Sequence, residues 1–134
     1  FWIVLLVIFP FTSNKAALDL PSSYHLEPAQ QLINQLGLEI DSLNLTGPVY
    51  YGNTYIPMSL GLDIDNPKEA RRIGLLYDGP AVEGSLVFWD SYFAVTDQDI
   101  GSEMLAKREE LTLWKKVDCT ECRNRYWIEL YLVK

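Results

Sequence analysis

The chain has few basic residues and gathers none of them into a cluster. Its 134 residues include 18 Asp and Glu but only 11 Lys and Arg, for a formal charge of −7. No basic run is longer than a pair, as in Arg71-Arg72 and Lys115-Lys116. Nucleic acids and anionic lipid surfaces are bound through clustered positive charge. The composition therefore argues against a nucleic-acid partner and against peripheral attachment to an anionic membrane.

Histidine and cysteine are also scarce, which limits the metal and catalytic sites that the chain can form. The single histidine is His25, and the two cysteines lie close together in Cys119-Thr120-Glu121-Cys122. A structural zinc site needs four ligands, and His25 is far from the cysteines along the chain. The sequence shows neither a Ser-His-Asp arrangement nor a glycine-rich phosphate loop. We therefore expect no metal site, no cofactor and no catalytic set, and a surface or capping role for His25.

The cysteine pair falls in a turn that is expected to join two strands. Redox-active pairs usually lie at a helix N-terminus, which favours the thiolate, whereas Asp118 and Glu121 disfavour it here. Two interpretations remain open. Cys119 and Cys122 form a local disulfide if the domain is exported, or they are two free thiols if it is not.

Two acidic triplets, Asp63-Ile64-Asp65 and Asp97-Gln98-Asp99, have the form that holds a divalent cation in many nucleotide-sugar glycosyltransferases. Asp-rich loops are common, however, and Asp65 directly precedes the helix-start signal Asn66-Pro67, where acidic residues are favoured anyway. We therefore expect a structural role for both triplets.

The first residues, Phe1–Phe11, contain no polar side chain and resemble nothing later in the chain. They are too few to cross a bilayer, which takes about 20 helical residues. We expect residues 1–20 to be the end of a transmembrane helix that begins upstream, followed by a connector. Two alternatives are a buried β-strand, since central parallel strands are continuously hydrophobic, and a signal peptide. The scarcity of positive charge after the segment favours an extracytoplasmic location for residues 21–134.

Residues 21–134 are expected to form one soluble domain, because about 100 residues is the usual size of a single core. Pro28 and the apolar residues at helical spacing after it predict a helix that ends at Gly37, where a left-handed residue is favoured. Asn66-Pro67 is a second start signal and predicts a helix through Ile73. Residues Asn53–Leu62 are expected to be a loop or a short helical turn that begins at Pro57, and Ser102 is expected to cap a further short helix.

Four segments have the composition of β-strands. Val49–Gly52 and Ser85–Asp90 are rich in β-branched and aromatic residues, and the second lacks alternation, which is typical of a central strand. Leu111–Val117 and Tyr126–Val133 alternate on either side of a turn and predict a β-hairpin. The order of elements indicates an α/β fold with a small mixed sheet of about four strands, in which two parallel strands with a helical crossover are extended by the C-terminal antiparallel hairpin.

The segment Trp89-Asp90-Ser91-Tyr92-Phe93 is the best candidate for a site, because it lies at the carboxyl end of the central strand. Open α/β sheets bind their ligands at that end. The alternative is that Asp90 caps the following turn and the rings fill the core.

Three segments together resemble a known family: the apolar start that ends in Pro10-Phe11, the stretch Val49–Pro57, and the stretch Gly84–Phe93. They are similar to the C-terminal extracytoplasmic domain of polytopic bacterial mannosyltransferase-like glycosyltransferases, which use lipid-phosphate sugars. The resemblance implies a tail domain that packs over the membrane active site or recognises an acceptor. It places the catalytic carboxylate on an upstream loop, so no catalytic residue is carried over to this chain. The Cys119–Cys122 turn is not a feature that we associate with the family.

Two functions follow as expectations. The first is an accessory, non-catalytic domain of a membrane glycosyltransferase in cell-envelope glycan synthesis, with the rest of the polytopic chain and a glycan or lipid-linked sugar as partners. The second is a self-contained soluble binding or interaction module, with Phe1–Phe11 as a buried strand. If a glycan is bound, the candidate residues are Tyr51, Tyr55, Trp89 and Asp90.

Overall fold

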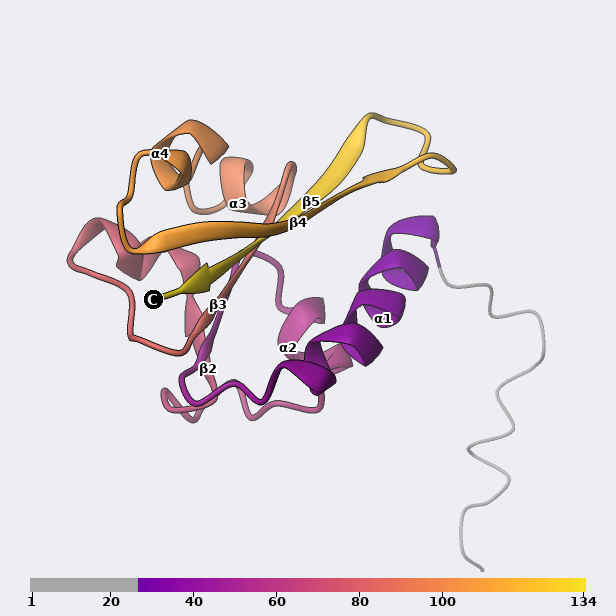
Figure 1. Ribbon diagram of the computed structural model, residues 1–134. Coiled ribbons are helices and arrows are strands. Elements are labelled where there is room, and N and C mark those ends of the chain that lie inside the picture. Colours follow the sequence, from indigo (N-terminus) through magenta and orange to yellow (C-terminus); the bar gives the residue numbers. More distant parts are fainter. Residues whose placement is uncertain (1–26) are drawn as a thin grey trace, which may run out of the picture.

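A computed structural model describes residues 27–134 (Figure 1). The predictions for Phe1–Phe11, for the connector to residue 20 and for His25 lie outside the described residues. Within residues 27–134, no helix has both the length and the apolar character that a membrane span requires.

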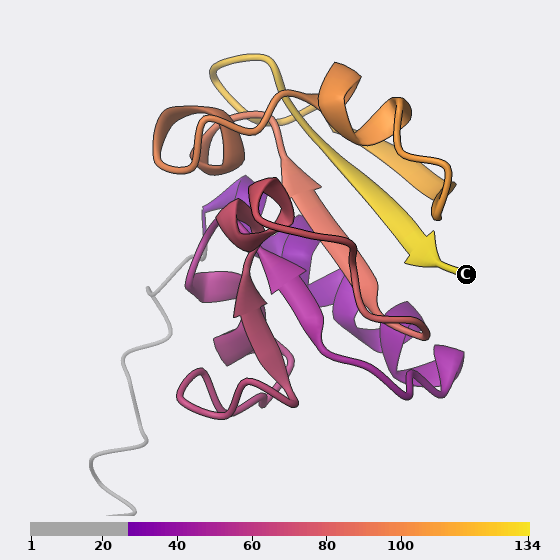
Figure 2. The same cartoon turned by 90° about the vertical axis from the view of Figure 1, so that its left-hand side faces the viewer.

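The described residues form a mixed α/β fold around one sheet of five strands in the order β2-β1-β3-β5-β4. Strands β1, β2 and β3 are parallel, β5 is antiparallel to β3, and β4 is antiparallel to β5 (Figure 2). The α/β class and the C-terminal hairpin are therefore confirmed. The strands are β1 (Val49–Tyr51), β2 (Ala70–Arg72), β3 (Leu86–Asp90), β4 (Leu111–Cys119) and β5 (Tyr126–Val133).

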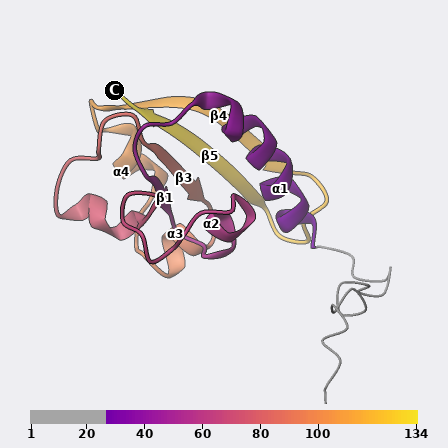
Figure 3. The same cartoon turned by 90° about the horizontal axis from the view of Figure 1, so that it is seen from below.

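Short helices cover both faces of the sheet. Helix α1 lies along one face together with α2, as the view from below shows (Figure 3). The opposite face is covered by η3, α3 and α4. The helical elements are α1 (Pro28–Ile40), η2 (Asp41–Leu43), α2 (Tyr55–Ser59), η3 (Ile73–Tyr77), α3 (Phe93–Thr96) and α4 (Ser102–Ala106).

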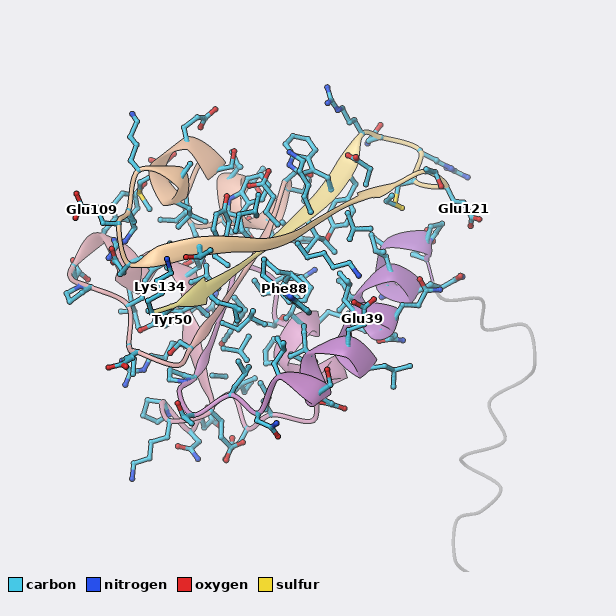
Figure 4. All side chains as sticks on the ribbon, viewed as in Figure 1. Glu39, Tyr50, Phe88, Glu109, Glu121 and Lys134 are labelled. Carbon is cyan, nitrogen blue, oxygen red and sulfur yellow. A yellow bond between two sulfur atoms is a disulfide. The ribbon has the colours of Figure 1, made fainter. Side chains whose placement is uncertain are left out.

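Strand β3 is buried along its whole length and contributes to both cores. Leu86 and Phe88 pack in the cluster on the α1 side, and Figure 4 labels Phe88 there. Val87 and Trp89 pack in the cluster on the α3 and α4 side. Because successive side chains of a strand point to opposite faces, the continuous apolar sequence of β3 is what a sheet covered on both sides requires.

The helix predicted over Asn66–Ile73 is wrong. The carbonyl of Asn66 accepts the N–H groups of Glu69 and Ala70, so a single turn forms before the chain extends into β2. β2 then pairs in parallel with β1, which satisfies its backbone on that side and adds a third parallel strand to the two that were predicted. The buried residues that follow, Ile73 and Leu76, are three positions apart and belong to the 3₁₀ helix η3.

The predicted end of the first helix at Gly37 is also wrong, because α1 continues to Ile40. Gly37 is buried inside the helix, and a Cβ there would lie 3.2 Å from the Leu60 Cδ2 atom. The glycine therefore allows close helix packing and does not end the helix. Two smaller boundaries differ: α2 begins at Tyr55, before Pro57, and α4 has Gly101 as its N-cap, with Ser102 inside the helix.

Gly52, which follows β1, lies against the backbone of α3. A Cβ at Gly52 would lie 2.8 Å from the Ala94 amide nitrogen and 2.9 Å from its Cα. We expect Gly52→Ala to lower the free energy of unfolding by about 1–3 kcal/mol, because two backbone segments must separate. Gly79→Ala is the matched control, since a Cβ there meets nothing within 4 Å. Chemical denaturation measures both, and equal stability of the two variants would contradict the close packing.

The double burial of β3 gives a second prediction. Val87→Asp would place a charge in a fully buried position, which costs several kcal/mol, so we expect the folded yield to be lost. Val95→Asp makes the same change at a residue that is 42 % exposed and should fold normally. A Val87→Asp protein with the denaturation midpoint of the wild type would show that β3 is not central.

Candidate functional site

A cleft of about 500 Å³ lies at the carboxyl end of β3. Small-molecule sites usually have volumes of about 300–1,000 Å³. Three segments form the walls: the start of α1, the residues that follow β3, and the turn between β4 and β5, where Figure 4 labels Glu121. The lining residues are Glu27, Pro28, Ala29, Ser91, Tyr92, Phe93, Glu121, Cys122, Arg123, Asn124, Arg125 and Tyr126.

The turn that forms one wall is closed by a disulfide between Cys119 and Cys122, whose Cα atoms are 5.5 Å apart. The pair lies in the hairpin connection and packs at the edge of the α1-side core. Of the two interpretations left open by the sequence, the structure contains the disulfide.

Asp90, the last residue of β3, holds the wall made by Tyr92 and Phe93. Its Oδ1 atom accepts the backbone N–H of Tyr92 at 3.1 Å and that of Phe93 at 2.6 Å. An aspartate that precedes a helix commonly fixes the first turn in this way. The capping role that the sequence offered as the alternative is therefore present, and it ties Asp90 to two residues that line the cleft.

The other carboxylate oxygen of Asp90 has no such partner. Asp90 is fully buried, and its Oδ2 atom has no hydrogen-bond partner in the described part of the chain. The hydroxyl of Tyr126, a lining residue of the cleft that is 9 % exposed, is likewise buried and unpaired there. Burying a polar atom without a partner costs about 1–3 kcal/mol, so each of these two atoms requires an explanation.

The charge of Asp90 acts on the ionisation of Tyr126. Burial raises the pKa of the Asp90 carboxyl above its ordinary value. Burial also raises the pKa of Tyr126, and the negative charge of Asp90 raises it further. Both side chains belong to the α1 side of the sheet, since Tyr126 packs in the cluster that contains Phe88 and Asp90 is two residues after Phe88 on β3. The two unpaired atoms therefore lie in one electrostatic environment.

The structure does not bring the four predicted glycan-contact residues into one surface. Tyr51 is buried in the α1-side core, with the Arg72 guanidinium 5.9 Å from its ring centre. Tyr55 donates its hydroxyl to Asn34 Oδ1 at 3.2 Å. Trp89 lies on the opposite face, is 1 % exposed and donates its indole N–H to the Ile100 carbonyl at 2.7 Å. Of the four residues, Asp90 is the one bonded to the cleft wall.

Sequence reasoning placed Tyr92 and Phe93 in the candidate segment Trp89–Phe93 but not among the glycan-contact residues, and it did not connect Tyr126 with the site. Tyr126 is the first residue of β5 and is paired with Cys119 across the hairpin. Because β5 runs antiparallel to β3, the beginning of β5 must lie at the carboxyl end of β3. The predicted hairpin therefore indicated that one of its strands has an end at the site. Tyr126 could be placed there only once β5, and not β4, was known to pair with β3.

The acidic triplets have local structural roles. Asp63 Oδ1 accepts the Asp65 backbone N–H at 3.0 Å, and Asp99 accepts the Tyr77 hydroxyl through its carbonyl. Among residues 27–134, no three His, Cys, Asp or Glu side chains are placed to hold a metal ion.

A second buried carboxylate, Glu129, lies on the opposite face of the sheet and differs from Asp90 in being fully paired. It accepts hydrogen bonds from the Lys116 ammonium at 2.7 Å, the Trp127 indole at 3.2 Å and the Tyr131 hydroxyl at 2.6 Å. Burial acts to raise the pKa of Glu129, but these partners hold it below its ordinary value. Glu129 therefore has the features of a structural network, and Asp90 does not.

Comparison with protein-family models, with curated proteins and with solved structures finds no match for this chain. The residues of the cleft are therefore the basis for assigning a function.

The disulfide encloses a very short loop and should contribute little to stability. The chain-entropy relation gives about 2 kcal/mol or less for a loop of this length. We expect the Cys119→Ser, Cys122→Ser double variant to lose only a few degrees of Tm in differential scanning calorimetry. A large loss of Tm, or stoichiometric zinc in the reduced wild type, would contradict this description of the turn.

Asp90 should make stability fall as the pH rises. Its raised pKa means that the native state keeps the proton to higher pH than the unfolded chain. The resulting contribution is complete below about pH 4 and is lost as the pH rises through the native pKa. Asp90→Asn keeps the oxygen that accepts from Tyr92 and Phe93 but cannot titrate.

We therefore expect Asp90→Asn to gain stability relative to the wild type between about pH 4 and about pH 8, measured by chemical denaturation at both values. Glu129 titrates in both proteins, so its contribution cancels in the difference. A difference that grows toward acid would show that the Asp90 carboxylate is stabilised in the native state.

Proposed function

We propose that residues 21–134 are an accessory extracytoplasmic domain of a membrane glycosyltransferase in cell-envelope glycan synthesis, and that the cleft at the end of β3 binds the glycan. The domain itself transfers no sugar, and the catalytic residues lie upstream. The proposal joins the resemblance carried by the segments Val49–Pro57 and Gly84–Phe93 with the chemistry of the cleft.

The observation that carries the proposal is the exposed aromatic wall of the cleft. Tyr92 is 56 % exposed, and its ring meets that of Phe93 edge to face with a centroid distance of 4.9 Å and an interplanar angle of 83°. Both are held through their backbone N–H groups by Asp90. A fixed, exposed aromatic ring offers an apolar face with a polar tip, which suits the C–H face and the hydroxyl edge of a sugar.

The charges around the cleft favour a neutral ligand. Glu27 and Glu121 contribute two carboxylates, and Arg123 and Arg125 contribute two guanidinium groups. The opposite charges are equal in number, so the lining has no net formal charge. It therefore favours neither an anion nor a cation. A neutral glycan is compatible with this balance.

The disulfide supports the proposed location. Disulfides persist in oxidising compartments such as the bacterial periplasm and the cell exterior, and they are rare in the cytosol. The bond between Cys119 and Cys122 closes the turn that forms one wall of the cleft. The wall would therefore have its described form on the extracytoplasmic side.

The second candidate function is a self-contained binding module, and the two apolar cores of the described residues favour it. Both cores are formed by residues 27–134, and both faces of the sheet are covered. The coding sequence upstream separates the two functions. Several further apolar spans of about 20 residues would identify the membrane enzyme, and a nearby start codon would identify the module.

The cleft gives a direct test in the 134-residue chain. We expect Tyr92→Ala to weaken binding of a soluble mannose oligosaccharide about tenfold, because the stacking face is lost. Tyr77→Ala is the matched control, since Tyr77 is 57 % exposed and does not line the cleft. Isothermal titration calorimetry measures both variants. Absence of binding by the wild type, or equal loss in the two variants, would contradict the proposed function.

A further inference from the structure

The cleft lies beside two buried polar atoms that are left unsatisfied. These are Asp90 Oδ2 and Tyr126 Oη, neither of which has a hydrogen-bond partner in residues 27–134. Asp90 is anchored through its other oxygen to Tyr92 and Phe93, which line the cleft, and Tyr126 lines it as well. Tyr126 is therefore a wall residue of the cleft, and Asp90 lies directly behind the wall, bonded to two residues that form it.

The chemistry of the pair specifies what would satisfy it. A carboxylate oxygen accepts hydrogen bonds, a protonated carboxyl donates one, and a phenol hydroxyl does either. A ligand hydroxyl both donates and accepts, so it can bridge Asp90 and Tyr126 in either protonation state of Asp90. A metal ion would need more ligands than one carboxylate and one phenol supply. An anion would be repelled by the ionised carboxylate of Asp90.

We propose that Asp90 Oδ2 and Tyr126 Oη form a hydroxyl-binding subsite behind the wall of the cleft, which takes one hydroxyl group of a neutral sugar ring. The inference rests on the proposed glycan-binding function and identifies its polar anchor. Because neither atom is exposed, the Tyr126 side chain moves to admit the hydroxyl, and the sugar face then rests against Tyr92.

Asp90 couples the subsite to the aromatic wall. One oxygen of its carboxyl group fixes the backbone of Tyr92 and Phe93, and the other is free for the ligand. The orientation of the free oxygen is thereby set by the same turn that positions the rings. A sugar that contacts both would be recognised by its ring face and by one particular hydroxyl.

Two isosteric variants separate a binding role from a packing role. Asp90→Asn keeps the oxygen that holds Tyr92 and Phe93 and replaces the free oxygen with an amide group. Tyr126→Phe removes only the unpaired hydroxyl. Tyr126→Phe removes a buried group that has no partner, and Asp90→Asn replaces a buried ionisable group with a neutral one. Each variant should therefore be at least as stable as the wild type near neutral pH. If the two side chains had a structural role, both variants would be less stable than the wild type.

The test is an NMR titration of the 134-residue chain with methyl α-mannopyranoside and each of its monodeoxy derivatives. We expect Asp90→Asn and Tyr126→Phe to weaken binding of the parent sugar at least tenfold, with no loss of Tm. One monodeoxy derivative should bind the wild type at least tenfold more weakly than the parent, and this discrimination should disappear in both variants. The controls are Asp78→Asn and Tyr77→Phe, which make the same chemical changes at exposed residues away from the cleft.

The outcomes distinguish the inference from the function on which it rests. Suppose that Tyr92→Ala weakens binding, that Asp90→Asn and Tyr126→Phe bind the parent sugar as tightly as the wild type, and that the wild type binds every monodeoxy sugar as tightly as the parent sugar. The cleft then binds glycan, and the unpaired atoms hold only buried water. The inference is then overturned and the proposed function stands. If the wild type binds no sugar, the function fails and the subsite fails with it.

Discussion

Strand β3 is packed between two separate apolar clusters and paired with a strand on each edge, and the rest of the domain is arranged around it. Leu86 and Phe88 pack in the core on the α1 side, and Val87 and Trp89 pack in the core on the α3 and α4 side. On one edge it is parallel to β1, and on the other it is antiparallel to β5. The only polar residue of β3 is its last one, Asp90, and this residue is still fully buried.

The position of Asp90 connects this constraint to the candidate site. A carboxyl group at the end of a fully buried strand lowers the stability of the fold through its desolvation unless it is paired. One oxygen of Asp90 is paired with the turn that starts α3, and the other is not. Glu129 on the next strand shows that this domain can satisfy a buried carboxylate completely. This difference between the two groups is the basis of our proposal that a ligand satisfies Asp90.

The features that were predictable from sequence are those set by local pattern, and those that were not depend on partners distant in the chain. The apolar run of β3 and the alternation in β4 and β5 identify their strands directly. β2 was missed because Asn66-Pro67 does start a helical turn, and pairing with β1 overrides it after one turn. Gly37 was assigned as a helix end because the contact with Leu60 that it permits cannot be seen in the sequence. For the same reason Asp90 was found, but Tyr126, which reaches the site through strand pairing, was not.

Native-state hydrogen exchange of the 134-residue chain tests the central role of β3 and its terminal carboxylate most directly. The amides of Val87–Asp90 should exchange only through global unfolding, as expected for the most stable core elements. The amides of Tyr92 and Phe93, which lie outside any strand, should share much of that protection because Asp90 accepts from both. Faster exchange in β3 than in the hairpin of β4 and β5, or unprotected amides at Tyr92 and Phe93, would contradict the account.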